Sequence, residues 1–126
     1  MIIMALGTFK NMILTIAAAN ECGFTFNPMK NSFPDRGYVV ASSETQDCIG
    51  SVGLNKVLKF YLKNRVYCIG CWRNEKGVLQ YDASRVFACI KDAIAAARIN
   101  GQRAIYDLNT NTEIMASEYH LYTCLS

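Results

Sequence analysis

The sequence VYCIGCWRNEKGVLQYDAS, residues 66–84, decides the fold because it predicts a β-hairpin. Residues 66–73 and 78–84 are rich in β-branched, aromatic and other apolar side chains, a composition that favours strands. The polar segment NEKG, residues 74–77, separates them, and Gly77 can adopt the left-handed conformation that a tight turn needs. We therefore expect two antiparallel strands joined by this turn.

The register of the hairpin determines which of its side chains meet the core. If Arg73 pairs with Val78, one face of the hairpin carries Cys68, Gly70, Trp72, Leu79, Tyr81 and Ala83. That face is apolar, and we expect it to meet the helices. The opposite face then carries Tyr67, Ile69, Cys71, Arg73, Gln80 and Asp82, and we expect it to stay open.

The motif Cys68-Ile69-Gly70-Cys71 has the spacing of redox and zinc-binding cysteine pairs. In a redox pair the first cysteine begins a helix, whose dipole lowers the thiol pKa, whereas this pair lies within a predicted strand. Residues three apart on a strand point to opposite faces, so the two thiols can neither bridge nor share a zinc ion. The chain has no second C-x-x-C and a single histidine. We interpret Cys68 and Cys71 as structural, and expect no metal and no cofactor.

The segments on either side of the hairpin each predict one strand and one helix. YVVAS (38–42) and RAIYDL (103–108) have the composition of strands. VGLNKVLKFYLKN (52–64) and CIKDAIAAARING (89–101) have the apolar spacing of amphipathic helices. The order β-α-β-β-α-β is that of the ferredoxin-like, split βαβ arrangement. The predicted fold class is therefore α+β, with a four-stranded antiparallel sheet and both helices on one face.

The length of 126 residues corresponds to a single domain. We expect an N-terminal amphipathic helix in residues 1–23, a linker in 24–37, the α+β core in 38–109 and a C-terminal tail in 110–126. The helix would align Phe9, Met12, Ile13 and Ile16 on one face. These apolar side chains must be buried. We expect them to cover the open face of the sheet, and the alternative is docking onto a second copy in a homodimer.

Composition and charge restrict the class of protein. Hydrophobic residues make up 52% and charged residues 18% of the chain, as in globular proteins. The net charge of +3 is well below that of a dedicated nucleic-acid binder. Charged and amide residues interrupt the N-terminal apolar run, and no basic segment precedes it, so neither a membrane span nor a signal peptide is expected. The six cysteines lie mostly in apolar runs, and we expect a cytoplasmic protein with reduced thiols.

Few residues offer catalytic chemistry. His120 is the only histidine, and no nucleophile signature surrounds Cys48 or Cys89, with which it would have to pair. Glu44 would need a second carboxylate on another element, whereas Asp47 belongs to the same loop. We therefore expect a protein that is not an enzyme.

Binding to a protein partner is the function that remains. The loop SSETQD, residues 42–47, follows the first predicted core strand, at the sheet end where ligands often bind. The predicted partner surface joins this loop to the open face and consists of Glu44, Gln46, Asp47, Tyr67 and Arg73. The alternative is a nucleic-acid-binding regulator that uses a basic helix face formed by Lys56, Lys59, Lys63 and Arg65.

The segments GYVVASSETQ (37–46), GLNKVLKFYLKN (53–64) and AIAAARINGQRAIYDL (93–108) resemble small uncharacterised proteins of phages and mobile elements of gut bacteria. The resemblance extends from about Gly37 to Leu108 and rests on turn glycines and packing residues. It implies an accessory role, such as host interference, regulation or maintenance of the element. It implies no activity and no functional residue.

Overall fold

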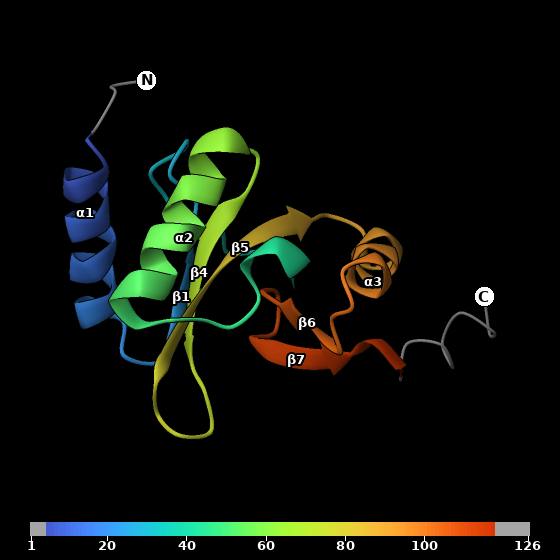
Figure 1. Cartoon of the computed structure of the whole chain (residues 1–126). Helices are drawn as coiled ribbons and strands as arrows, with labels where there is room; N and C mark the ends of the chain where they lie inside the picture. Colours follow the sequence, from blue (N-terminus) through green and yellow to red (C-terminus); the bar gives the residue numbers. More distant parts are fainter. Residues whose placement is uncertain (1–4, 118–126) are drawn as a thin grey trace.

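The computed structural model describes residues 5–117 and has an α+β architecture (Figure 1). Its helices are α1 (Leu6–Ala19), α2 (Gly50–Lys63) and α3 (Ile90–Ile99), with a short 3-10 helix η1 (Ser43–Thr45). Its strands are β1 (Phe24–Phe26), β2 (Tyr38–Ala41), β3 (Cys48–Ile49), β4 (Cys68–Arg73), β5 (Leu79–Phe87), β6 (Ala104–Asp107) and β7 (Thr112–Met115). The predicted α+β class is confirmed. His120 and most of the predicted tail lie outside the described residues.

All the strands belong to one antiparallel sheet, which has seven strands where four were predicted. The order is β1-β4-β5-β2-β6-β7, and the short β3 also pairs with β5. The four predicted strands correspond to β4, β5, β2 and β6, which lie side by side in that order in the middle of the sheet. Strands β1, β3 and β7 are additional. Strands β1 and β3 have only three and two residues, and β7 lies in the segment that was predicted as the C-terminal tail.

The first of these additions corrects the predicted linker. Phe24–Phe26 pairs with β4 as an edge strand, so the prediction of a linker is wrong for these residues. Two phenylalanines flank Thr25, which is the alternation of a half-buried strand. The two prolines further along the segment favoured a linker, and three residues of alternation were too few to indicate a strand against them. The remainder, residues 27–37, connects β1 to β2.

The predicted register of the hairpin is wrong by one residue. Arg73 pairs with Leu79, so the turn contains five residues, 74–78. The cause is Asn74, whose side-chain Oδ1 accepts hydrogen bonds from the backbone nitrogens of Lys76 (2.9 Å) and Val78 (3.0 Å). The side chain of Asn74 thus closes a longer turn than the glycine alone indicated.

This shift exchanges the two faces of β4. Ile69 and Cys71 lie with Tyr81 and Ala83 on the face that meets the helices. The predicted register had placed Ile69 and Cys71 on the open face instead. Cys68, Gly70 and Trp72 lie on the open face instead. For β5 the prediction is confirmed, since Gln80 and Asp82 share the open face with these β4 residues.

The helices all pack against one face of the sheet, in two separate clusters. Leu54, Val57, Leu58 and Tyr61 of α2 pack against Ile69, Cys71, Tyr81 and Ala83 of β4 and β5. Ala93, Ile94 and Ala97 of α3 pack against Val40 of β2 and Ile105 of β6. Strand pairing aligns the inward positions of all four strands, so both clusters lie on the same side.

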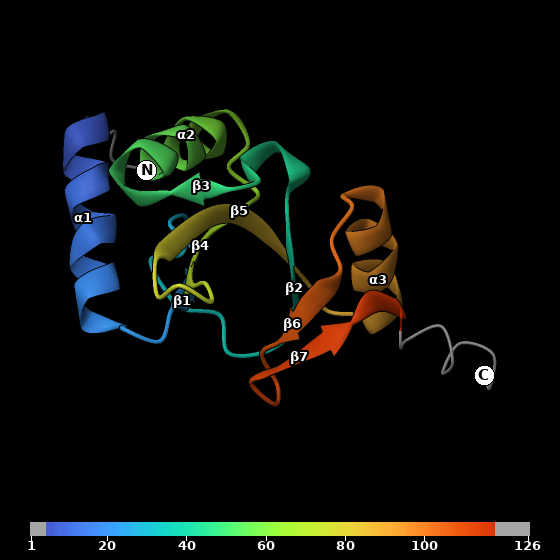
Figure 2. The same cartoon turned by 60° about the horizontal axis from the view of Figure 1, so that its bottom comes forward.

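The N-terminal helix does not cover the open face, which corrects that prediction. Phe9, Ile13 and Ala17 of α1 belong to the same cluster as α2, and the Phe9 ring meets the Tyr61 ring edge-on at 5.6 Å. Figure 2 shows α1 beside α2 on the helical side. Strand β1 explains the position, because Phe26 extends the apolar surface on that side. The homodimer alternative stays a prediction.

Candidate binding cleft at strands β2 and β5

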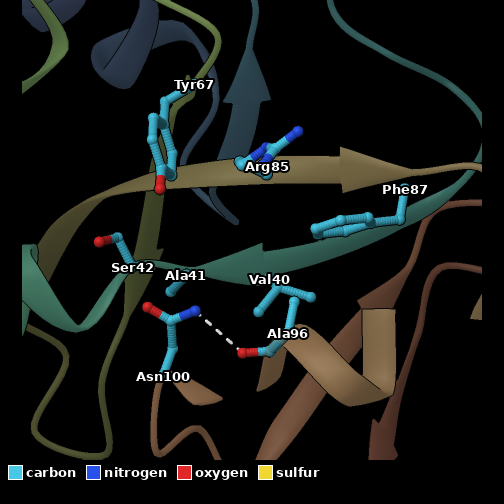
Figure 3. Close-up of a pocket in the computed structure, with 8 residues that line it drawn as sticks. All are labelled: Val40, Ala41, Ser42, Tyr67, Arg85, Phe87, Ala96 and Asn100. Atoms are coloured by element: carbon cyan, nitrogen blue, oxygen red, sulfur yellow. Dashed lines mark hydrogen bonds between the residues drawn. The ribbon is translucent and has the colours of Figure 1, made fainter. Parts of the chain in front are cut away.

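A cavity of about 70 Å³ lies on the helical side of the sheet, where the two clusters meet (Figure 3). It is lined by Val40, Ala41, Ser42, Tyr67, Arg85, Phe87, Ala96 and Asn100. These residues come from β2, from the N-cap of η1, from β5, from α3 and its C-cap, and from the loop that precedes β4. We call this cavity the cleft.

Arg85 gives the cleft its charge. It continues the helix-facing positions of β5 after Tyr81 and Ala83, but unlike them it is exposed. Its guanidinium carbon lies 5.2 Å from the centre of the Phe87 ring, a cation–π contact that orients the side chain. No carboxylate within residues 5–117 forms an ion pair with it. The Arg85 guanidinium is therefore held in place at the cleft, and no carboxylate of the described residues accepts its hydrogen bonds.

The walls of the cleft are tied together by hydrogen bonds. The Asn100 side chain donates to the Ala96 carbonyl oxygen (2.9 Å) and accepts from the Ser43 nitrogen (3.1 Å), which joins α3 to the η1 loop. The Ser42 hydroxyl oxygen accepts from the Glu44 nitrogen (3.2 Å). The walls are therefore formed before any ligand enters.

Tyr67 supplies a second polar group. Its ring packs edge-on against Phe60 of α2, with centroids 5.1 Å apart. Figure 3 shows that its hydroxyl end points toward Ser42. A phenol and a guanidinium that line the same small cavity are the kinds of donor that bind a carboxylate or phosphate oxygen.

The structure brings together part of the predicted partner surface. Tyr67 lines the cleft, and Glu44 and Gln46 lie on the loop at its rim, next to Ser42 and Asn100. Gln46 accepts a hydrogen bond from the Gln102 side chain (3.0 Å), and Asp47 is exposed at the far end of the loop with a φ of 56°. Buried Thr45 anchors the loop, because its hydroxyl oxygen accepts from the Ala83 nitrogen (2.9 Å).

Arg73 does not belong to this surface. Its guanidinium donates to the carbonyl oxygens of Glu21 and Gly77, both at 2.9 Å, so it braces the hairpin against the end of α1. The predicted combination of Tyr67 and Arg73 on an open sheet face is therefore wrong. Tyr67 lies on the helical side because β4 has the opposite facing to the predicted one.

Sequence reasoning missed Arg85 and Asn100. The second hairpin strand was predicted to end at Ser84, whereas β5 continues to Phe87 by pairing with β2. The available signal was a cation in an otherwise apolar alternation, Tyr81, Ala83, Arg85 and Phe87. A charge at an inward position of a strand indicates either a gap in the core or a site.

The basic helix face lies elsewhere. Lys56, Lys59 and Lys63 are exposed on α2, and Arg65 is exposed just after it. None of them lines the cleft. The nucleic-acid alternative stays a prediction.

The two cysteines of the C-x-x-C motif lie on opposite faces of β4, as predicted. Both are buried, and burial raises the pKa of each thiol to about 11. Thiols with such pKa values are protonated and unreactive at neutral pH. Within residues 5–117 no three His, Cys, Asp or Glu side chains are grouped so that they can hold a metal ion.

A broader groove of about 790 Å³ lies between residues 27–37 and the end of the sheet. Its amide side chains are engaged internally: Asn27 accepts from the Lys30 nitrogen, and Asn109 bonds Gly37 and Asp107. Its exposed Arg36 lies 3.7 Å from Asp35. Asn27, Asn109, Arg36 and Asp35, which all line the groove, are thus engaged within the chain.

No protein-family model, curated protein or solved structure matches the chain. The resemblance to proteins of phages and mobile elements thus stays a prediction. Among the helices of residues 5–117, none has the length and apolar character needed to cross a membrane.

Proposed function

We propose that this protein is a non-enzymatic binding protein, and that an acidic side chain or chain terminus of a protein partner enters the cleft. The observation that carries the proposal is Arg85, a cation held over Phe87 with no carboxylate partner in the described chain. Guanidinium groups bind carboxylates through paired, charge-assisted hydrogen bonds. The net charge of +3 also favours association with an acidic partner.

The dimensions of the cleft support a side chain as its occupant. Pockets for drug-sized ligands measure roughly 300–1,000 Å³, whereas the cleft measures about 70 Å³. That volume suits one carboxylate-bearing group. Val66 and Ile99, which adjoin Tyr67 and Asn100 in the chain, are 73% and 86% exposed and offer apolar contact area for the rest of a partner.

The test is capture of a partner from host lysate by the tagged protein, with and without nuclease, read by mass spectrometry. We expect the wild-type chain to retain a partner after nuclease and Arg85→Ala to lose it. The matched control is Arg98→Ala, an exposed arginine of α3 that does not line the cleft. Equal retention by Arg85→Ala and wild type would contradict the cleft, and loss of all material with nuclease would favour the nucleic-acid regulator with its lysine face.

The core is proposed to be of the ferredoxin-like, split βαβ kind. The support is the order β4-β5-β2-β6 in the middle of the sheet, with α2 between β2 and β4 in the chain and α3 between β5 and β6. A cytoplasmic location is proposed as well, supported by the five free thiols of the described residues. The accessory role implied by the resemblance is consistent with a small binding protein of this kind.

A further inference from the structure

The open face of the sheet carries a second, unrelated group of side chains. Strand pairing places Trp72, Gln80 and Ile49 in one row across β4, β5 and β3. The next row contains Gly70 and Asp82, and the row after it contains Cys68 and Ser84. Trp72 and Ile49 are each 46% exposed, so the first row is accessible from solvent.

Gly70 creates a recess for the Asp82 carboxyl. A Cβ atom at Gly70 would lie 3.0 Å from the Asp82 Cγ and would overlap its Oδ1. Gly70 itself is buried, and Asp82 is only partly exposed. The carboxyl of Asp82 therefore lies flat on the neighbouring strand, where little water reaches it.

No basic side chain of the described chain compensates this carboxyl. No ion pair within residues 5–117 involves Asp82. Burial raises the pKa of Asp82 to about 6, and hydrogen bonds from the side chains of Trp72 and Ser84 offset this rise only in part. A desolvated carboxylate without a counter-charge is costly, and it attracts a cation strongly.

A second observation concerns the hydrogen bonding around the carboxyl. The Ser84 hydroxyl is buried, with the residue 1% exposed, and it meets no hydrogen-bond partner at proper geometry. Ser84 is two residues from Asp82 and lies on the same face. Buried hydroxyls are nearly always paired, and the nearby Asp82 carboxyl is an acceptor for the side chains of both Ser84 and Trp72. The carboxyl therefore has neutral donors on its own face but no cationic one.

Trp72 narrows the chemistry of that ligand. Its half-exposed indole lies in the row next to Asp82, and aromatic faces attract guanidinium and ammonium groups. Ile49 adds apolar surface on which the methylene stem of a long side chain can pack. Among cationic side chains, arginine combines stacking on an indole with multiple donors for one carboxylate.

We propose that the open face at Trp72 and Asp82 binds an arginine side chain of a partner polypeptide. The guanidinium stacks on the indole and donates to the Asp82 carboxylate. The segments MIIM and EYHLYTCLS, outside the described residues, contain no lysine or arginine, so neither of them supplies the guanidinium. This site lies on the face opposite the cleft, so a test of one site does not decide the other.

The experiment uses Trp72, the only tryptophan of the chain, as its own reporter. The full-length protein is titrated with N-acetylarginine amide and with N-acetylcitrulline amide, the neutral isostere, at constant ionic strength. Indole fluorescence and the indole N–H resonance of Trp72 are both followed. We expect saturable changes with the arginine compound, in roughly the millimolar range for so small a ligand, and none with the citrulline compound.

Asp82→Asn tests the carboxylate, and it should weaken binding by about tenfold or more, since a charge-assisted contact is removed. Asp92→Asn, which changes an exposed aspartate on α3, is the matched control and should bind as wild type does. The indole resonance also reports whether each variant is folded. Equal responses to the two compounds, no saturable response to arginine, or unchanged binding by folded Asp82→Asn would each overturn the proposal.

Discussion

At the scale of single residues, the buried carboxyl of Asp82 makes stability depend on pH. Burial raises its pKa from 3.8 to about 6. As pH rises, the unfolded chain ionises first, so the free energy of unfolding falls between about pH 4 and pH 6 and stays lower above that range. Asparagine removes this cost. We expect Asp82→Asn to raise the free energy of unfolding at pH 7 by roughly 1–3 kcal/mol, and to have little effect near pH 4.

Urea denaturation of both chains at the two pH values measures this difference. Glu75→Gln, in the exposed hairpin turn, is the control for loss of one negative charge. A stabilisation of equal size at both pH values would show that the effect does not come from ionisation of Asp82. Destabilisation at pH 7 would show that the carboxylate already has a favourable partner.

Gly70 is the second residue whose role is local and specific. Alanine at this position would meet the Asp82 carboxyl, and overpacking of this kind costs about 1–3 kcal/mol. The control is Gly7→Ala in α1, where nothing lies within 4 Å of the added Cβ; it should be neutral or stabilising by up to about 1 kcal/mol. Chemical denaturation measures both.

The double variant Gly70→Ala/Asp82→Ala decides whether the cost arises from that contact. We expect the alanine at position 70 to be tolerated better once the carboxyl is gone, because the space it needs is then free. Equal costs in the two backgrounds would place the strain elsewhere.

At the scale of elements, the side chain of Asn74 sets the register of the β4–β5 hairpin. It accepts two backbone hydrogen bonds in the turn. Asn74→Ala leaves these donors without their partner, and we expect a loss of about 1–2 kcal/mol in the free energy of unfolding. Glu75→Ala, one residue further in the same turn, should change it by less than about 0.5 kcal/mol. A neutral Asn74→Ala would mean that the strand pairs alone determine the register.

The elements that sequence predicted are those whose patterns are local. The apolar spacing predicts an inner face of α2 that consists of Leu54, Val57, Leu58, Tyr61 and Leu62. The first four are buried, whereas Leu62 lies at the border of this face and is 37% exposed. Register and strand length were missed because they depend on side-chain hydrogen bonds and on pairing between distant segments. The pairing of β5 with β2 carries the strand to Phe87 and so positions Arg85 in the cleft. Tyr67 was selected from the sequence because it is aromatic. It was assigned to the open face because of the predicted register, and since that register is wrong by one residue, the assignment is wrong as well.

At the scale of the whole molecule, α1 completes the core beside α2. Phe9 is 6% exposed and packs on Tyr61, and its replacement by alanine should cost about 3–5 kcal/mol. Leu14, on the outer side of the same helix, is 39% exposed, and its replacement should cost less than about 1 kcal/mol. Thermal denaturation distinguishes them. Costs of similar size would indicate that the outer face of α1 is also buried, as in the homodimer alternative, and sedimentation would then show a dimer.

The two proposed binding sites occupy opposite sides of one strand. Asp82 and Arg85 are three residues apart on β5, so their side chains point to opposite faces of the sheet. Each group contacts neighbours on its own face. The Asp82 carboxyl occupies the space beside Gly70 and accepts a hydrogen bond from Trp72, and the Arg85 guanidinium stacks on the Phe87 ring. Binding at one face therefore leaves the other group where it was. We expect Arg85→Ala to leave the arginine titration of Trp72 unchanged, within about a factor of two.

The same independence determines how a partner can use both faces. A single rigid domain contacts one side of the sheet, so a partner held through both sites must wrap around an edge or contribute two separate segments. For such a partner, linking the two contacts raises the affinity beyond that of either one. Arg85→Ala and Asp82→Asn would each then weaken its capture, whereas separate partners would each respond to one variant alone. Capture by the wild-type chain and by both single variants, compared protein by protein, distinguishes these arrangements.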